Sequence, residues 1–197
     1  MLLTRLRENG LDLLPWDDRC EQLRRRLQLA HCRLGSPWPN RSRQRLQDAP
    51  EDWILEASLS CSSWSELESS TLQEALWGNL SWPERRELDR LLPERLTIPS
   101  GRDARLEYGE EEVTLAVKLQ EMFGCAEGPV LLNGDLPVTL ELLSPAGRPL
   151  QRTRDLRGFW AGSYSDVRRE MRGRYPKHPW PESPMTAAPT AKTKKAR

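Results

Sequence analysis

The hydrophobic pattern changes its period near Leu96, and this change is the strongest constraint on the fold. Upstream, apolar residues recur at helical spacing, most clearly over 20–34. Downstream, short alternating segments lie between turns rich in Gly, Pro and Asn, which is typical of strands. The sequence therefore predicts an α+β chain: a helical subdomain over 1–95, a small β-sheet with flanking helices over 96–184, and a disordered basic tail over 185–197.

Helix ends are marked in the first half of the chain. Asp18 with Glu21, and Ser81 with Glu84, have the spacing of a capping box, in which side chains satisfy the free backbone N–H groups of a first turn. Gly35 is suited to end the helix that Asp18 begins. Shorter helices are expected over 51–59 and 72–80.

The second half is expected to form strands over 105–108, 130–132, 138–143 and 150–153. Asn133-Gly134 lies between the second and third of these segments and signals a hairpin. The segment 113–123 fits both an alternating strand and a helix, and we favour a helix that starts near Thr114. An OB-like barrel over part of 96–153 is an alternative arrangement.

Helical spacing returns over 154–172, in two pieces, because Gly158 and Gly162 weaken the first half. Ser163 and Asp166 have capping-box spacing for the second piece. One face of this segment is apolar and the opposite face is rich in arginine. The apolar face holds Leu156, Phe159, Trp160, Tyr164, Val167 and Met171.

Charge is unevenly distributed, although the net charge of the chain is only +1. Residues 148–197 contain 13 Lys and Arg against 4 Asp and Glu, which leaves 17 against 25 in the first 147. A basic end on an acidic body suggests a polyanionic partner for that end. The alternative is a solvated tail and a charged helix face.

Arginine and aromatic residues alternate in the same basic stretch. The guanidinium fork matches phosphate oxygens, and rings among cations provide stacking surfaces for single-stranded nucleic acid. We therefore expect a surface that binds RNA or single-stranded DNA. Its candidate residues are Arg154, Arg157, Arg168, Arg172, Arg174, Lys177 and Trp180. The alternative is an ordinary amphipathic helix followed by a proline-ordered loop that packs back on the domain.

Motifs for catalysis and metal binding are missing. No Gly-x-x-x-x-Gly-Lys-Ser/Thr loop and no acidic box is present, so the chain lacks the phosphate cradle and magnesium carboxylates of a nucleotide-driven motor. Its two histidines, His31 and His178, lie far apart. We expect no catalytic residue, no metal and no cofactor, and we interpret the acidic run Glu110-Glu111-Glu112 as a solvated loop.

No secretion signal and no membrane-spanning run of about 20 apolar residues is found. We therefore expect a cytoplasmic protein without a membrane partner. The four cysteines, Cys20, Cys32, Cys61 and Cys125, contain no Cys-x-x-Cys pair and are expected to be free thiols.

Several segments together resemble one known family. They are 116–124 (AVKLQEMFG), 142–149 (LLSPAGRP), 155–160 (DLRGFW), Tyr164, and 167–180 (VRREMRGRYPKHPW), with 14–16 (LPW) and 96–101 (LTIPSG) upstream. In this order they strongly resemble the C-terminal region of HrpB-type ATP-dependent helicases, relatives of the DEAH-box RNA helicases. The resemblance extends from about residue 6 to residue 184.

The resemblance implies an accessory portion of a helicase whose motor domains are encoded elsewhere or missing. It implies no catalytic residues for this chain, only a role in nucleic-acid contact or in docking to the motor. Trp53, Trp64 and Trp77 are candidates for a docking face. The alternative function is a protein–protein adaptor that uses its arginine row and Trp-rich face on an acidic partner.

Overall fold

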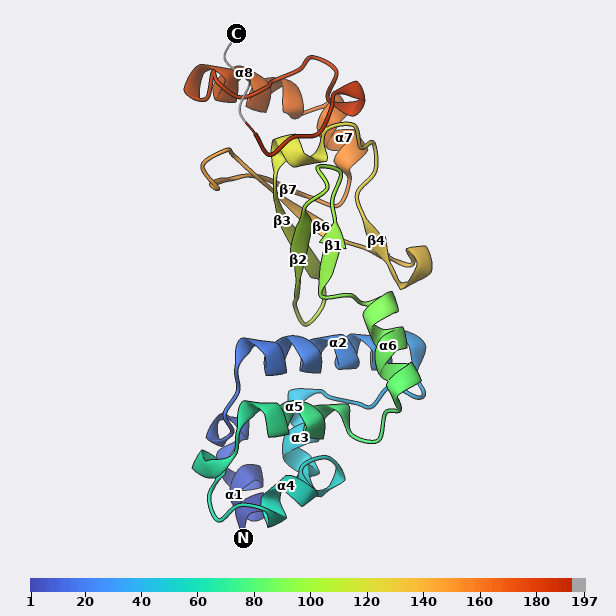
Figure 1. Ribbon diagram of the computed structural model, residues 1–197, viewed down its shortest axis with the longest axis vertical. Coiled ribbons are helices and arrows are strands. Elements are labelled where there is room, and N and C mark those ends of the chain that lie inside the picture. Colours follow the sequence, from blue (N-terminus) through green and yellow to red (C-terminus); the bar gives the residue numbers. More distant parts are fainter. Residues whose placement is uncertain (193–197) are drawn as a thin grey trace. The chain divides into compact units, whose positions relative to one another are not determined.

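The computed structural model describes residues 1–192, and the chain separates into two compact units, Met1–Leu92 and Pro93–Arg197 (Figure 1). The first unit is helical and the second combines a sheet with helices, which confirms the predicted α+β class. The domain limits expected from the sequence, 1–95, 96–184 and 185–197, stay a prediction.

The helical unit contains six α-helices and three short 3-10 helices. They are α1 (Leu2–Asn9), η1 (Leu11–Leu13), α2 (Asp18–Leu34), α3 (Arg43–Asp48), η2 (Pro50–Asp52), α4 (Leu55–Leu59), η3 (Trp64–Glu66), α5 (Ser69–Trp77) and α6 (Trp82–Leu91). Helix α2 packs along α5, and the two lie side by side in Figure 1. The predicted helix over 51–59 is therefore two pieces, η2 and α4.

Helix α2 begins one residue earlier than its predicted capping box. The side chain of Asp17, rather than Asp18, accepts a hydrogen bond from the backbone N–H of Cys20 at 2.7 Å. Gly35 ends the helix with φ of 72°, as predicted, because glycine tolerates this left-handed conformation. The second predicted capping box is confirmed, since Ser81 N–H donates to the Glu84 carboxylate at 2.6 Å.

The core of the helical unit includes two buried arginines of α2. Arg26 donates from Nε to the carbonyl oxygen of Leu92 at 2.7 Å and pairs with Asp89. Arg24 pairs with Glu21 at 2.8 Å and donates to the Arg41 carbonyl oxygen at 3.1 Å. Each buried guanidinium thus has acceptors, which offsets the cost of removing its charge from water.

Over residues 93–192 the second unit has a five-stranded sheet, a two-stranded ladder and two α-helices. Its elements are β1 (Arg95–Thr97), β2 (Asp103–Tyr108), β3 (Val113–Lys118), η4 (Leu119–Met122), β4 (Val130–Leu131), η5 (Leu132–Gly134), β5 (Leu136–Pro137), β6 (Thr139–Leu143), β7 (Pro149–Thr153), α7 (Leu156–Ala161), α8 (Tyr164–Arg174) and η6 (Pro184–Thr186). Figure 1 shows α7 and α8 near one end of the sheet.

The sheet order is β1-β2-β3-β6-β7, with β3 and β6 parallel and the other neighbours antiparallel. Strands β1 and β7 form its two edges within residues 1–192, so the sheet is open. The OB-like barrel that the sequence allowed is therefore not formed, because a barrel requires its edge strands to pair.

The predicted helix from Thr114 is wrong, because 113–118 is the central strand β3. Val113, Leu115 and Val117 are buried on one face, and the strand pairs with β2 on one side and β6 on the other. The chain then turns into η4. The helical spacing of Leu115, Leu119 and Met122 spans this junction and does not belong to one helix.

The predicted hairpin at Asn133-Gly134 forms, but it is smaller than expected. Strand β4 pairs with β5 through Val130↔Pro137 and Leu131↔Leu136. Asn133 and Gly134 take positive φ values of 58° and 111° in the turn. The predicted strand over 138–143 corresponds to β6 and pairs with β3 in the larger sheet.

Residues 184–190 contact η4 and Gly124, while the predicted disorder of 185–197 stays a prediction. Gly124 N–H donates to the carbonyl oxygen of Pro184 at 2.9 Å, and Thr190 N–H donates to that of Gln120 at 2.9 Å. These bonds hold the segment that follows α8 against η4. The remainder of the predicted tail, 193–197, lies outside the described residues.

Candidate nucleic-acid interface

Helices α7 and α8 form as two pieces, as predicted. Asp155 caps α7, because its carboxylate accepts from Gly158 N–H at 2.7 Å. Ser163 makes no side-chain capping bond at the start of α8, so the third predicted capping box is wrong.

An aromatic cluster anchors both helices. Trp160 lies 5.0 Å from Phe159 and 5.2 Å from Tyr164 between ring centroids, and Phe123 contacts the cluster from the end of η4. The Trp160 indole donates to the Cys125 carbonyl oxygen at 2.8 Å. Tyr164 donates to that of Pro181 at 2.8 Å, and burial raises the pKa of Tyr164 to about 12. The predicted apolar face is therefore the packing face.

The loop after α8 packs back on the unit. Trp180, which we expected to offer a stacking surface, is 6% exposed. Its indole donates to the Tyr175 carbonyl oxygen at 2.9 Å. Arg168 donates to the Trp180 carbonyl oxygen at 2.9 Å and pairs with Glu182 at 2.9 Å. Both Trp180 and Arg168 therefore hold the loop. The buried Trp180 ring does not offer the expected stacking surface, whereas the Arg168 side chain stays 25% exposed and its contact with nucleic acid stays a prediction.

The other arginines of the predicted row lie at the surface and have acidic neighbours. Arg154 pairs with Glu112 at 3.3 Å and Arg157 with Glu127 at 2.6 Å. Arg174 pairs with Glu170, one turn earlier on α8, at 3.3 Å. The side chains of these arginines remain 55–62% exposed, so their guanidinium groups stay accessible to solvent.

Arg172 and Lys177 differ from the rest of the row. Both are exposed, and neither side chain makes a hydrogen bond or an ion pair with any residue among 1–192. Arg172 lies in the last turn of α8, and Lys177 lies in the loop that follows. They are the two fully available cations of the predicted set.

The acidic partners of the paired arginines were not predicted from the sequence. Glu112, which we interpreted as part of a solvated run, accepts from Thr139 at 3.0 Å and pairs with Arg152 and Arg154. The Thr139 hydrogen bond, aided by the two arginines, holds the pKa of Glu112 below its ordinary value. The preceding residue of the acidic run, Glu111, is exposed and makes no hydrogen bond or ion pair with residues 1–192.

Of the three tryptophans expected to form a docking face, two are buried and Trp77 is half-buried, with the Arg85 guanidinium 5.1 Å from its ring centroid. Trp53 and Trp64 are 7% and 5% exposed. Trp82, at the start of α6, is 76% exposed, and the Arg85 guanidinium lies 5.6 Å from its ring centroid. Exposed aromatic surface in the helical unit is therefore concentrated at Trp82, which the sequence pattern did not distinguish.

Over residues 1–192 there is no group of three or more His, Cys, Asp or Glu side chains placed to hold a metal ion. None of the helices in this range combines the length and apolar character needed to cross a bilayer. All four cysteines are free thiols. Burial raises the pKa of Cys20 to about 11.

Comparison with known proteins gives a consistent result. Residues 53–184 match the family described as ATP-dependent helicase C-terminal (HrpB_C). The ATP-dependent RNA helicase HrpB of Escherichia coli (strain K12) is 44% identical over 196 residues, which cover 98% of this chain and 24% of that protein. The chain thus spans about a quarter of the length of this relative.

Two solved structures share the fold. The crystal structure of the E. coli DExH-box NTPase HrpB superposes with a TM-score of 0.86 at 44% identity and covers 97% of this chain and 24% of the other. The crystal structure of the Escherichia coli DEAH/RHA helicase HrpB gives a TM-score of 0.72 at 42% identity. This match covers 91% of this chain and 23% of the other. The chain therefore belongs to the HrpB family of ATP-dependent helicases and corresponds to their C-terminal region.

Proposed function

We propose that this C-terminal region contacts nucleic acid, with RNA as the first candidate, and leaves ATP hydrolysis to motor domains outside it. The observation that carries the proposal is that Arg172 and Lys177 are exposed and unpaired within residues 1–192, beside surface arginines that keep solvent access. The name of the E. coli relative, an RNA helicase, supports RNA. A cytoplasmic location is part of the proposal.

Ion pairing of the neighbouring arginines does not prevent this role. Exposed ion pairs contribute only about 0–1 kcal/mol, so a phosphate can compete for them at little cost. A guanidinium also has about five N–H donors, more than a single carboxylate uses. We therefore expect Arg154, Arg157 and Arg174 to contact the phosphates of a nucleic acid that Arg172 and Lys177 attract. Arg168 and Trp180 support this surface by fixing the loop.

The test is the salt dependence of binding to fluorescently labelled single-stranded RNA, measured by anisotropy on the whole chain. Three to five phosphate contacts give a log–log slope of roughly −2 to −3.5, because each contact contributes about −0.7 on a single strand. The double substitution Arg172→Ala and Lys177→Ala should make the slope shallower by about 1.4. The same titration with single-stranded DNA of the same sequence shows whether the chain binds RNA more tightly than DNA.

A matched control is Arg19→Ala with Arg33→Ala. It removes the same charge from α2, where both side chains are exposed and make no hydrogen bond or ion pair with residues 1–192. Its slope should equal that of the unmodified chain. Equal loss in both double variants, or loss of all binding on deletion of 193–197 alone, would contradict the proposed surface. Displacement of RNA by an acidic peptide at lower concentration would instead favour the adaptor alternative.

A further inference from the structure

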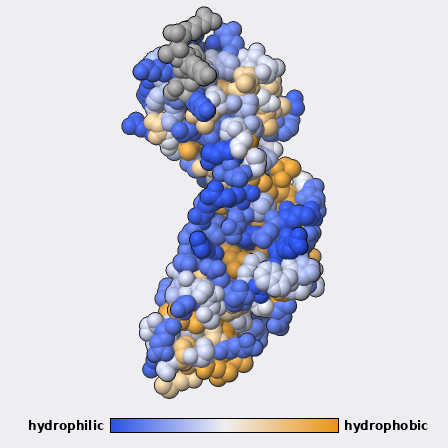
Figure 2. All heavy atoms as spheres, viewed as in Figure 1, coloured by the Kyte–Doolittle hydropathy of each residue, from blue (hydrophilic) through white to orange (hydrophobic). Residues whose placement is uncertain are grey.

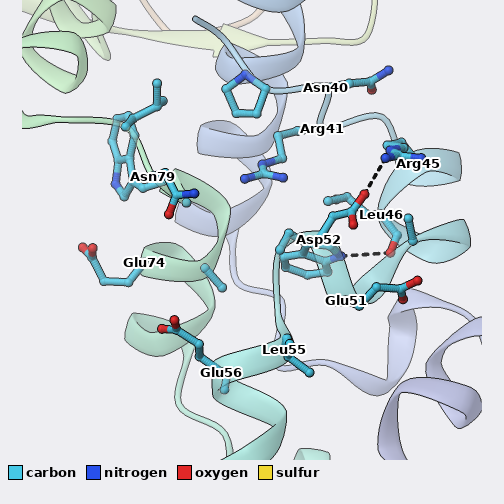
Figure 3. Close-up of a pocket in the computed structure, with 18 of the residues that line it drawn as sticks. Asn40, Arg41, Arg45, Leu46, Glu51, Asp52, Leu55, Glu56, Glu74 and Asn79 are labelled. Atoms are coloured by element: carbon cyan, nitrogen blue, oxygen red, sulfur yellow. Dashed lines mark hydrogen bonds and ion pairs between the residues drawn. The ribbon is translucent and has the colours of Figure 1, made fainter.

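A pocket of about 840 Å³ opens in the helical unit. It lies among the loop 37–41, α3, η2, α4 and α5, and Figure 3 shows its lining side chains. Figure 2 shows hydrophobic residues in a recess of the helical unit, framed by hydrophilic ones. The volume falls within the range of about 300–1,000 Å³ that is typical of ligand sites.

The central side chain of this pocket is Arg41. It is 6% exposed, and in Figure 3 its guanidinium extends toward the middle of the pocket. Its backbone is fixed, because Arg41 N–H donates to Gln28 at 2.6 Å and its carbonyl oxygen accepts from Arg24 at 3.1 Å. Its Nε donates to the Leu76 carbonyl oxygen at 2.8 Å. The cation is therefore held in one position.

The terminal nitrogens of Arg41 lack a partner. No hydrogen bond or ion pair joins them to any residue in 1–192, whereas buried Arg24 and Arg26 in the same unit both have carboxylate partners. The nearby carboxylate of Asp52 is already paired with Arg45. Burial lowers the pKa of Arg41 to about 10, which leaves it charged at neutral pH. Attraction to the Asp52 carboxylate opposes this shift but supplies no hydrogen bond to the terminal nitrogens of Arg41, so an incoming anion that accepts from them would be stabilised.

Gly78 provides the room for this guanidinium. A Cβ at this position would lie 2.7 Å from an Arg41 terminal nitrogen, and the φ of 59° at Gly78 also disfavours other residues. The approach of the backbone to the cation thus depends on glycine. Arg41 and Gly78 together indicate a site shaped for the cation and open toward a ligand.

The rim of the pocket selects the kind of anion. Glu56 is exposed at the rim and has no ion pair among residues 1–192, whereas Glu74, Glu51 and Asp52 face the same pocket (Figure 3) and pair with Arg85, Arg7 and Arg45. Five carboxylates and three arginines line the pocket, so its lining keeps an excess of negative charge. A strand of phosphodiesters would bring a negative charge at each step toward these carboxylates and be repelled. A single carboxylate flanked by cations matches both the central Arg41 and the acidic rim. Apolar walls for aliphatic side-chain stems come from Pro37, Leu46, Trp53, Trp77 and Leu80.

We propose that this pocket binds a protein segment through one Asp or Glu carboxylate, which pairs with Arg41, while neighbouring Lys or Arg side chains of that segment face the acidic rim. A guanidinium and a carboxylate can form two parallel hydrogen bonds, which gives the site both affinity and orientation. The proposal is independent of nucleic-acid binding, which is assigned to the other unit.

The experiment titrates the whole chain, labelled with ¹⁵N-arginine, with blocked peptides and follows the guanidinium resonances. The probe is acetyl-Gly-Lys-Glu-Lys-Gly-amide, and its control carries Gln in place of Glu. We expect the Glu peptide to shift the Arg41 resonance saturably and to bind at least about tenfold more tightly than the Gln peptide, since hydrogen bonds between charged groups are the strong ones. Equal binding of both peptides, or no saturable shift, contradicts the proposal.

Two variants separate binding from folding. Arg41→Gln should abolish the preference for the Glu peptide, with thermal unfolding measured alongside. Glu56 lies on the exposed rim, so Glu56→Gln should leave the fold intact. It should lower the affinity for the Glu peptide by about threefold, as expected for the loss of one surface charge pair. An unchanged affinity in Glu56→Gln contradicts the role of the rim.

Two further probes identify the source of the anion. Sodium acetate presents the carboxylate alone, and single-stranded RNA presents phosphates. Acetate should bind at least about tenfold more weakly than the Glu peptide, because it lacks the flanking cations that the rim attracts. If acetate binds as tightly as the peptide, the site is assigned to small carboxylates. If RNA displaces the peptide from Arg41, the site is assigned to nucleic acid. Either result overturns the peptide assignment.

Discussion

Glu121 lies in η4 with its side chain 2% exposed, yet it is charged. Burial raises its pKa, but hydrogen bonds from Arg102 at 2.7 and 2.8 Å and from Lys118 N–H at 3.0 Å outweigh this effect and hold the pKa below the ordinary 4.5. The residue lies inside a segment that resembles the helicase family, and its role here is to tie η4 to the turn that contains Arg102.

Replacing Glu121 by Gln should therefore destabilise the chain by about 1–3 kcal/mol at neutral pH, since a buried charged hydrogen-bond network loses one partner. Because the folded pKa is depressed, the stabilisation by Glu121 is present above pH 4.5 and is lost as the pH falls through the folded pKa. Urea unfolding at a series of pH values measures this. The free-energy difference between the two chains should shrink in acid, and Glu111→Gln, at an exposed position, should show no such difference.

At the scale of single elements, helix α7 depends on one close contact. A Cβ at Gly158 would lie 2.1 Å from Oδ2 of the Asp155 carboxylate, whose other oxygen, Oδ1, caps the helix. The glycine that seemed a weakness in the sequence pattern is thus the position that makes room for the cap. The substitution Gly158→Ala normally stabilises a helix by about 1 kcal/mol, but here it displaces a cap of about the same value.

We therefore expect Gly158→Ala to destabilise the chain or leave it unchanged, and Asp155→Ala to cost about 1 kcal/mol. In the Asp155→Ala background the same Gly158→Ala change should become stabilising, because the collision is removed and only helix propensity remains. A double-mutant cycle by thermal unfolding measures this coupling. Additive effects in the cycle would show that the cap and the glycine act independently.

Local patterns predicted elements well where the signal was complete within one element. The apolar face of α7 and α8, Gly35 as a helix end and the Ser81–Glu84 capping box are all visible within a few residues. The strand β3 was missed because its partners β2 and β6 are set by tertiary pairing, which overrides local helical spacing. The position of Trp180 was missed for the same reason, since its burial depends on the path of the loop.

At the scale of the whole molecule, the basic character of the C-terminal stretch is largely balanced within its own unit. Residues 93–192 contain 14 Lys and Arg and 14 Asp and Glu. Glu112 and Glu127 come from segments 30 or more positions before the arginines that they pair with. Sequence spacing could therefore predict the arginine row but not its partners, and the excess of +9 is not the charge that a ligand meets.

This balance makes a prediction about nucleic-acid binding, since Glu112 holds both Arg152 and Arg154. Glu112→Gln should release these two cations and strengthen RNA binding by roughly two- to fivefold, with a steeper salt slope by about 0.7 for each phosphate newly contacted. The control is Glu111→Gln, which removes the same charge from the adjacent exposed residue without releasing an arginine. If both variants bind RNA equally well, the gain reflects net charge alone. If only Glu112→Gln gains affinity, the carboxylate pairing of Arg152 and Arg154 is what limits their contact with RNA.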